Sequence, residues 1–300
     1  IYRLGLIKSY LENNKEGKVY SSAHGFTNTL RMQHSKPLVN LPSVAKPYGT
    51  EIRGCLATLD EDKIMCGSDI SGLESATQDH YMFFFDPEYV NEKRVPGFDP
   101  HLDIAKLAGF LTEEEEIIFK EKSDEQIYKK VKDYRQTAKG VNFSATYGAG
   151  PAKIAETAKI PLKEGKRLHE IYWNRNSAIK KTAKALTVKT VNGQDWVYNP
   201  VAKFWYFLKE EKDKFSTLNQ GTGVFVFDTW LRFVRQSLQQ FDCKVLYQYH
   251  DELMFICNKT DQERIENILF DCIKLANEKL QLNIEIGISV DWGNNYAECH

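Results

Sequence analysis

Two short apolar runs, Val245–Tyr249 and Leu253–Cys257, are separated by only three polar residues, His250-Asp251-Glu252. Three residues are too few for a helix or a crossover connection, but they suffice for the turn of a β-hairpin. The sequence therefore predicts two antiparallel strands with the polar residues at the tip. Asp251 interrupts an apolar segment there, and a carboxylate so placed costs several kcal/mol unless a cation compensates it.

A second carboxylate ends another predicted strand, Ile64–Asp69. Two such aspartates on adjacent strands could hold a pair of divalent ions about 3.5–4 Å apart, the arrangement used in phosphoryl transfer. Magnesium suits this arrangement because it needs only one or two carboxylates besides phosphate oxygens. Taken alone, either aspartate is more often a strand-end cap or a turn residue, and the spacing does not establish that the two meet.

A stripe of four residues, Arg135, Lys139, Phe143 and Tyr147, recurs at intervals of four and stops at Gly148. On a helix each step of four residues drifts by only about 40°, so the four side chains share one slowly turning face. Two successive cations there could grip a triphosphate, and an aromatic ring one turn further on could stack on a base. The competing interpretation is an amphipathic surface with Phe143 and Tyr147 in the core.

The remaining patterns predict helices and further strands. Asp99-Pro100 has the form of an N-cap followed by proline at the first helical position. Capping-box spacing at Ser123–Gln126 and Asp133–Gln136 suggests that the helical run Thr112–Tyr147 is two helices. The other expected elements are helices over His101–Leu107, 151–186 and Phe215–Phe241, a hairpin turn at Val191–Gln194, and a last strand over Ile284–Val290. The predicted fold is α+β, an antiparallel sheet with a helical insertion.

Charge is distributed unevenly along the chain. Between Lys129 and Lys189 there are 15 Lys/Arg and four Asp/Glu, a net charge of +11, whereas the whole chain carries −1. A basic lobe joined to an acidic body is expected of a protein that holds a polyanion in one place and cations in another, although a solvated helical face is an equal alternative.

Other composition features exclude several classes. No apolar run approaches the roughly 18 residues of a membrane span. The six cysteines are scattered without a CxxC pair, which argues against a disulfide scaffold or a structural zinc site and favours a reducing cytosol.

Three segments together resemble the signature motifs of family A DNA polymerases, the DNA polymerase I-like group. They are D-x-S-x-x-E at 69–74, R-x-x-x-K-x-x-x-F-x-x-x-Y-G at 135–148 and H-D-E at 250–252. The resemblance extends from about Val19 to the C-terminus. Matching flanks are Thr29-Leu30-Arg31, Asn40-Leu41-Pro42, Asp99-Pro100-His101 and Leu218-Asn219-Gln220-Gly221, and the ending 292–296 with His300 looks most like the phage replicative branch.

The resemblance implies a role for each matched residue. Asp69, Asp251 and the main-chain carbonyl of Ile70 would bind two magnesium ions, for which manganese can substitute. The nucleotide would be contacted by Arg135, Lys139, His101, Phe143, Tyr147 and Glu74, with Glu74 rejecting a 2′-hydroxyl and Lys139 also a general acid. DNA would be contacted by Arg31, Gln220, His250 and Glu252.

The resemblance also implies an architecture and partners. Residues 1–15 would be a thumb stub or linker, 16–82 and 215–300 the palm, and 83–214 the fingers, with the thumb largely absent and no exonuclease domain. Primer–template DNA and deoxynucleoside triphosphates would be the substrates, with no membrane partner, in the cytoplasm of a phage host. A second polypeptide supplying thumb and exonuclease, or a processivity factor, is a further expected partner.

The match departs from the family in two places. Ser75-Ala76 follow Glu74 where the family has a Leu-Arg pair, and an aromatic segment, 204–212, replaces the basic residues before the glutamine helix.

Three other functions stay open. A single-subunit RNA polymerase uses related motifs, although Glu74 and Glu252 favour deoxynucleotides. A nucleic-acid-binding accessory subunit with a vestigial polymerase site is compatible with an absent thumb. A two-metal nuclease would have no use for the stripe from Arg135 to Tyr147.

Overall fold

The computed structural model describes residues 2–299; Ile1, and His300 of the resemblance, lie outside the described residues. The chain forms two compact units. Unit 1 comprises residues 1–77, 199–207 and 218–300, and unit 2 comprises residues 78–198 and 208–217. The chain is α+β, as predicted. The expected assignment of its parts to thumb, palm and fingers stays a prediction.

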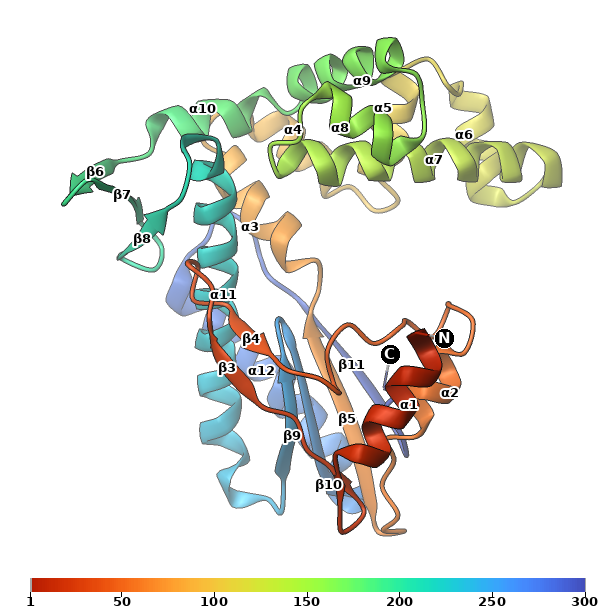
Figure 1. Ribbon diagram of the computed structural model, residues 1–300, viewed down its shortest axis with the longest axis vertical. Helices are drawn as coiled ribbons and strands as arrows, with labels where there is room; N and C mark the ends of the chain where they lie inside the picture. The colour runs from red at the N-terminus through yellow and green to blue at the C-terminus, as the bar shows by residue number, and fades with distance from the viewer. Residues whose placement is uncertain (1, 300) are drawn as a thin grey trace. The chain divides into compact units, whose positions relative to one another are not determined.

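Unit 1 is built on a four-stranded antiparallel sheet in the order β11-β5-β10-β9 (Figure 1). Its strands are β5 (Lys63–Ile70), β9 (Lys244–Tyr249), β10 (Glu252–Asn258) and β11 (Ile288–Gly293). The predicted hairpin is confirmed as β9 and β10, and the predicted strand ending at Asp69 as β5. Strands adjacent in space are therefore up to about 220 residues apart in sequence, with Ser289 opposite Asp69.

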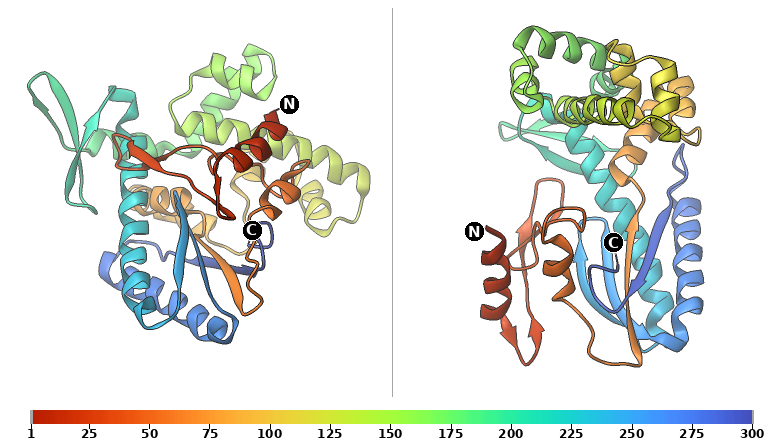
Figure 2. Two further views of the ribbon diagram at one scale, coloured as in Figure 1. Left: turned by 60° about the horizontal axis from the view of Figure 1, so that its bottom comes forward. Right: turned by 90° about the vertical axis from the view of Figure 1, so that its right-hand side faces the viewer.

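The two faces of this sheet are buried by different segments. Met65 and Met254 pack with Tyr296 and Cys299 on one face. Residues alternate across a strand, so Phe255 lies on the opposite face, where its ring meets that of Trp292 edge-on. Figure 2 shows helix α12 (Gln262–Leu280) running along this side of unit 1.

The remaining elements of unit 1 surround the sheet. They are α1 (Tyr2–Glu12), β1 (Asn14–Lys15), β2 (Lys18–Val19), β3 (Ala23–Phe26), β4 (Met32–His34), α2 (Gly49–Gly54), the start of α3 (Leu73–Met82), most of β8 (Phe204–Leu208), most of α11 (Lys214–Ser237) and the short 3-10 helices Leu238–Gln240 and Lys259–Asp261. The predicted helix Phe215–Phe241 is thus largely confirmed as α11, which ends four residues earlier.

Unit 2 is mainly helical. Its elements are α4 (Pro87–Lys93), α5 (Pro100–Leu107), α6 (Glu113–Glu121), α7 (Glu125–Thr146), α8 (Pro151–Ala158), α9 (Leu162–Arg175), α10 (Ser177–Ala185), the hairpin β6 (Val188–Val191) and β7 (Gln194–Asn199), and the 3-10 helix Glu211–Asp213. The hairpin turn is confirmed, with positive φ at Asn192 and Gly193. Among the described residues no helix has the length and apolarity of a membrane span.

The predicted break in the long helical run is only partly correct. The run does form two helices, but α7 begins after Asp124, whose carboxylate accepts hydrogen bonds from Gln126 N and Ile127 N at 2.9 Å. The second expected break, at Asp133–Gln136, is wrong. Helix α7 continues through it because one face, including Val131 and Ala138, is fully buried.

The predicted last strand was placed too early. Ile284 and Ile286 are buried, which gives the alternating pattern, but the strand β11 begins only at Ile288. The Asn277 side chain of α12 takes the place of a strand partner. Its amide donates to Ile286 O at 2.8 Å, and its oxygen accepts from Ile286 N at 2.9 Å.

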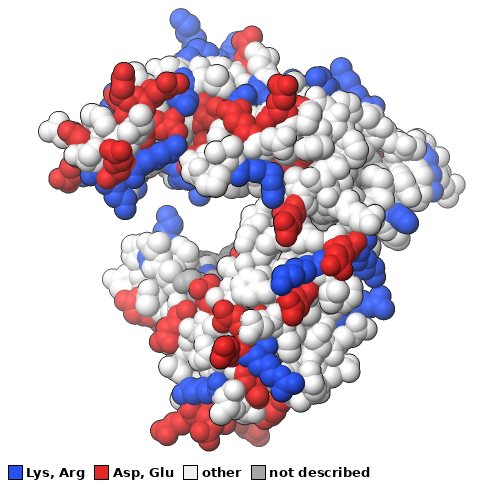
Figure 3. All heavy atoms as spheres, turned by 180° about the vertical axis from the view of Figure 1, so that it is seen from behind, with Lys and Arg blue, Asp and Glu red and all other residues white. Residues whose placement is uncertain are grey.

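The expected division into a basic lobe and an acidic body is weaker in the folded chain. Unit 2 holds 23 Lys/Arg and 21 Asp/Glu, a net charge of +2, and unit 1 holds 17 and 20, a net charge of −3. The basic run 129–189 folds with an acidic segment of the same unit, for example through Lys130–Glu115 at 2.6 Å. Figure 3 shows both signs interspersed.

A glycine in β5 tests the packing of the sheet. A Cβ at Gly67 would lie 2.5 Å from Cys299 O and 3.0 Å from Met254 Sδ. We therefore expect Gly67→Ala to lower the free energy of unfolding by about 1–3 kcal/mol, the cost of overpacking a core. Urea denaturation measures this. Gly54→Ala in α2 is the matched control, because no atom lies within 4 Å of its added Cβ. An equal effect of both substitutions would contradict the packing described here.

Candidate active site

The register of β5 and β10 brings the two predicted aspartates to one end of the sheet. Glu252 pairs with Asp69, and Ile70 N donates a hydrogen bond to Asp251 O at 3.1 Å. His250 adopts φ 60° in the turn that leads into β10. Asp69 follows a run of buried residues, so its carboxylate and that of Asp251 project where the sheet ends. The meeting of these strand ends was left open by the sequence.

The two carboxylates repel one another. Burial raises the pKa of Asp251, the negative charges of Asp69 and Glu74 raise it further, and Arg31 opposes them. Asp69 accepts a hydrogen bond from the Ser289 hydroxyl, which fixes its carboxylate from the neighbouring strand. Since both aspartates are half-buried, two adjacent ionised carboxylates here need a cation for stability.

The two carboxylates suit a hard divalent ion that also binds ligands from outside the protein. No cluster of three or more His, Cys, Asp or Glu side chains with metal-binding geometry occurs within residues 2–299. The protein side chains at this point are therefore two carboxylates. That number suits magnesium, which takes one or two carboxylates and fills its remaining positions with water or phosphate oxygens. The Ile70 carbonyl stays a predicted ligand.

Glu252 lies elsewhere than the sequence suggested. It was expected at the hairpin tip in contact with DNA, but it is the first residue of β10 and only 8% exposed. Its carboxylate accepts a hydrogen bond from the Tyr296 hydroxyl at 3.1 Å. The Glu252 side chain therefore has a partner within unit 1, and its contact with DNA stays a prediction.

Glu74 and Gln220 come from two helices that Asn219 links. Glu74 lies in the first turn of α3, and its main-chain oxygen accepts from the Asn219 amide at 3.0 Å. The Asn219 oxygen in turn accepts from the Thr77 hydroxyl at 2.8 Å. Asn219 is buried, whereas the next residue, Gln220, is half-buried. In the sequence Asn219 is a flanking residue of the motif, and its position directly before Gln220 is the available signal for its role.

Arg31 and His250 line one cavity with the second half of α11. Burial lowers the pKa of His250 to about 4, with Arg31 and His34 lowering it further. The His250 ring is therefore neutral at pH 7. It packs on Tyr249, with ring centroids 3.9 Å apart.

In unit 2, Arg135 is held by the residue that caps α5. Arg135 Nε donates to Asp99 Oδ2 at 2.5 Å, and the other oxygen of Asp99 accepts from His101 N and Leu102 N. Burial alone would raise the pKa of Asp99, but these hydrogen bonds lower it overall. Asp99 therefore stays ionised. The predicted helix start at Asp99-Pro100 is confirmed.

The other stripe residues remain accessible. Phe143 and Tyr147 are 51% and 42% exposed, so the alternative that placed them in the core is wrong. Lys139 Nζ lies 5.8 Å from the centre of the Phe143 ring. Helix α7 ends at Thr146, and Tyr147 follows as its C-cap. That this stripe faces the two aspartates stays a prediction.

Asn142 is a site residue that the sequence reasoning missed. Its amide nitrogen donates to Pro100 O at 3.0 Å and lies 2.9 Å from His101 Nδ1. Since an amide nitrogen only donates, Nδ1 must accept, and the ring proton lies on Nε2. Burial lowers the pKa of His101 to about 4. The imidazole is thus neutral, with an N–H donor on its far edge. Asn142 directly precedes Phe143 and lies inside the motif at 135–148, and this position was the available signal.

A comparison with known families now bears on these residues. The family model for DNA polymerase family A matches residues 106–298. The chain belongs to DNA polymerase family A. Among curated relatives, DNA polymerase I of Helicobacter pylori (strain J99 / ATCC 700824) is 28% identical over 260 residues, which cover 79% of this chain and 26% of the relative. The DNA-directed DNA polymerase of Enterobacteria phage T3 is 22% identical over 317 residues, 95% of this chain and 42% of the relative.

Solved structures agree on the fold of this family A chain. The POL domain of Pol1 from M. smegmatis, in complex with DNA primer-template and dNTP, superposes with a TM-score of 0.74 at 19% identity. The match covers 99% of this chain and 51% of that one. Compared with the two curated relatives described above, the chain spans only about a quarter to two-fifths of their length. Family A polymerases generally use divalent metal ions.

The repulsion between the carboxylates of Asp69 and Asp251 predicts an effect on the free energy of unfolding. In EDTA, Asp251→Asn should raise the free energy of unfolding, because it removes a buried charge next to Asp69. The destabilisation by ionised Asp251 is fully present above its raised pKa and fades as the pH falls through that value, so the gain should shrink in acid. With magnesium at about 100 times its dissociation constant, wild type should gain about 2.7 kcal/mol and the variant less.

Thermal unfolding with and without magnesium measures both effects. Asp291→Asn is the matched control, since Asp291 is an exposed carboxylate on the neighbouring strand β11. A wild type that is more stable than Asp251→Asn even in EDTA would contradict the repulsion.

A second prediction concerns the tautomer of His101. Asn142→Leu keeps the size of the side chain but removes the donor to Nδ1, so the imidazole should lose its single tautomer. Nitrogen-15 chemical shifts of the ring at pH 7 report this. In wild type we expect a protonated Nε2 and an unprotonated Nδ1. Asn174→Leu, at an exposed position of α9, should leave the shifts unchanged. A wild type already mixed between tautomers would refute the assignment.

Proposed function

We propose that this chain carries the polymerase centre of a template-directed DNA polymerase, which adds deoxynucleotides to a primer 3′ end by two-metal phosphoryl transfer. One observation carries the proposal: Asp69 near the end of β5 and Asp251 in the turn before β10 lie at one end of the sheet, where burial and the charge of Asp69 raise the pKa of Asp251. Membership of family A supports the same reaction class. The phage relatives, which align with 95% of the chain, support a role in phage genome replication.

Residues 16–82 and 215–300, most of which belong to unit 1, would be the palm, and residues 83–214, most of which belong to unit 2, would be the fingers. The sheet of unit 1 offers the rigid support that a metal site needs. Asp69 is paired with β10 on one side and β11 on the other, and the main-chain oxygen of Asp251 accepts a hydrogen bond from Ile70 N. Unit 2 offers the cations and aromatic rings of α7. Residues 1–15 would be a thumb stub or linker, and a second polypeptide that supplies thumb and exonuclease, or a processivity factor, would be a further partner.

The carboxylates of Asp69 and Asp251, with the Ile70 carbonyl, would hold two magnesium ions, or manganese in their place. Bound there, divalent ions neutralise charge on the attacking and leaving oxygens of an in-line displacement. Ser289 keeps the Asp69 carboxylate in one orientation. Phosphoryl transfer needs little covalent chemistry from the protein, so positioning and charge are the main contributions of these residues.

The triphosphate would be bound by three donors from unit 2. Lys139 supplies a cation with no ion pair within the described part of the chain, and it could protonate the pyrophosphate leaving group. His101 supplies a neutral Nε2–H donor, set by Asn142. Arg135 supplies its terminal guanidinium nitrogens, since Asp99 is bonded to Nε.

The aromatic residues and Glu74 would select the nucleotide. Phe143 presents an exposed ring beside Lys139, which suits contact with the sugar and base of the incoming nucleotide. Tyr147 would lie at the template-base position. Glu74, at the start of α3, would exclude a 2′-hydroxyl. Arg31 and Gln220 would read minor-groove acceptors common to all correct base pairs, and His250 would lie near the primer 3′ end.

Primer extension tests the proposal and separates the other functions. With primer–template and magnesium, wild type should extend the primer with dNTPs, and Asp251→Asn should be slower by about a hundredfold or more. Asp291→Asn should extend at the wild-type rate.

Each alternative has its own outcome. Extension with NTPs alone would indicate an RNA polymerase, and DNA binding without extension an accessory subunit. Loss of primer nucleotides in place of gain would indicate a nuclease. Any of these outcomes overturns the proposal.

A further inference from the structure

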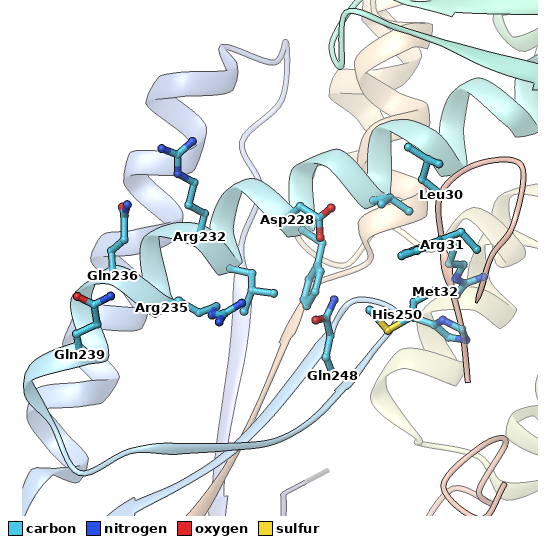
Figure 4. Close-up of a pocket in the computed structure, with 14 residues that line it drawn as sticks. Leu30, Arg31, Met32, Asp228, Arg232, Arg235, Gln236, Gln239, Gln248 and His250 are labelled. Atoms are coloured by element: carbon cyan, nitrogen blue, oxygen red, sulfur yellow. The ribbon is translucent and has the colours of Figure 1, made fainter. Parts of the chain in front are cut away.

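Two cysteines lie opposite one another at the base of the β9–β10 hairpin. The ladder of these strands pairs Lys244 with Ile256, so one step further along the same ladder Cys243 faces Cys257. Both thiols are free. The tip of the hairpin, at the other end of the strands, borders the cavity of Figure 4, which His250 lines.

The spacing of an antiparallel ladder suits a bond between these residues. Directly opposed Cα atoms lie about 4.5 or 5.5 Å apart, according to their place in the hydrogen-bond pattern. Disulfides join Cα atoms that are about 4.4–6.8 Å apart, so either kind of pair can be bridged without a shift of the strands. The two thiols already interact, since Cys257 donates a hydrogen bond to the sulfur of Cys243.

Both cysteines are tied to the central strand β5. Asp242, the residue before Cys243, forms an ion pair with Lys63 of β5. Cys257 is fully buried in β10 and pairs with Ile64 of β5. The two sulfurs are therefore held near one another before any reaction, which lowers the entropic cost of joining them.

The two thiols differ in reactivity. The hydrogen bond from Cys257 lowers the pKa of Cys243, and the Lys63 cation lowers it further. Burial and the carboxylates of Asp261 and Asp242 oppose this shift without cancelling it. The same hydrogen bond, together with burial, raises the pKa of Cys257. Since the thiolate is the nucleophile, the half-buried Cys243 is the sulfur that reacts first.

The other four cysteines do not combine these features. Cys66, Cys272 and Cys299 are buried, and burial raises the pKa of each thiol. The exposed Cys55 donates its thiol hydrogen to Glu51 O at 3.2 Å. Among the cysteines, access to solvent, a lowered pKa and a facing thiol therefore coincide at Cys243.

We propose that Cys243 and Cys257 form a redox-active dithiol site, which takes a hydroperoxide as its oxidant and closes to a disulfide across the base of the hairpin. Neither sulfur has a part in the proposed phosphoryl transfer, so the site stands apart from that function. In a reducing compartment a bond of this kind is transient and reports the redox state.

Oxidation takes two steps. The Cys243 thiolate attacks the terminal oxygen of the hydroperoxide, the O–O bond breaks, and a sulfenic acid forms while the departing alkoxide takes up the thiol proton. The Cys257 sulfur then attacks the Cys243 sulfur. The S–O bond breaks, and the Cys257 proton leaves with the hydroxide as water. Two thiols are oxidised to one disulfide, and the hydroperoxide is reduced to an alcohol and water. A dithiol reductant restores both thiols by exchange.

The disulfide would restrain the hairpin whose tip carries Asp251. It closes the loop 243–257, which limits the unfolded chain and opposes separation of the strands at their base. We therefore expect the main-chain amides of β9 and β10 to exchange with solvent more slowly in the oxidised protein than in the reduced one.

Disulfide mapping of the full chain tests the site. Reduced protein is treated with a stoichiometric amount of hydrogen peroxide, blocked with iodoacetamide, digested without reductant and analysed by mass spectrometry. We expect a peptide pair linked through Cys243 and Cys257. Titratable thiols should fall from six per chain to four, six less the two in the bond, and dithiothreitol should restore them. Cys243→Ser should abolish the link and slow thiol loss by about tenfold or more.

Two variants control for the other thiols. Cys55→Ser removes the exposed thiol of α2, and the Cys243–Cys257 link should form as in wild type. Cys66 lies on β5 opposite Phe255, diagonally across from Cys257, and Cys66→Ala should also leave the link unchanged. Circular dichroism verifies that each variant is folded.

Three results would overturn the assignment. They are a wild type in which Cys257 links to Cys66, one in which Cys55 is oxidised while Cys243 and Cys257 stay reduced, and equal amide exchange in the two redox forms. None of these measurements needs DNA or a nucleotide, so a chain that fails to extend a primer would remove the proposed function and leave the dithiol site to be decided by mapping.

Discussion

The pairing of β5 with β10 and β11 is the constraint on which the candidate metal site of unit 1 depends. Main-chain pairing with β10 and β11 fixes β5, and the bond from Ile70 N to Asp251 O closes the ladder at this end. A shift of register by one residue would turn every side chain to the other face. The buried residues on both faces of β5 prevent that shift. Burial of these residues therefore keeps the carboxylates of Asp69 and Asp251 at the same end of the sheet.

The sequence was sufficient for features set by neighbouring residues. The β9–β10 hairpin, the cap at Asp99 and the turn at Asn192-Gly193 follow from local pattern. It was insufficient where a distant side chain decides. Glu252 is drawn into the core by Tyr296, 44 residues away, and Asn277 takes the place of a strand partner for Ile286. Neither partner leaves a periodic signal, because each acts once, through one side chain.

The distribution of charge along the sequence also differs from its distribution in the folded protein. The run 129–189 is strongly basic in sequence, yet unit 2 as a whole is nearly neutral because acids of other segments fold beside it. Net charge along the chain therefore says little about where an anion binds. A cation without a carboxylate partner among residues 2–299, such as Lys139 on α7, is more informative. Its proposed ligand is the triphosphate of the incoming nucleotide.

The pairing of Arg135 with Asp99 looks at first like a loss of one phosphate ligand. Asp99 is held by two main-chain N–H groups of α5 and stays ionised, so it cannot easily leave. Its bond is to Nε, however, and a guanidinium has two further nitrogens in a rigid plane. Asp99 therefore orients the plane of Arg135 and leaves its outer edge for an anion. Together with Asn142, which orients His101, it sets two phosphate donors before any nucleotide arrives, and this preorganisation reduces the entropy cost of binding.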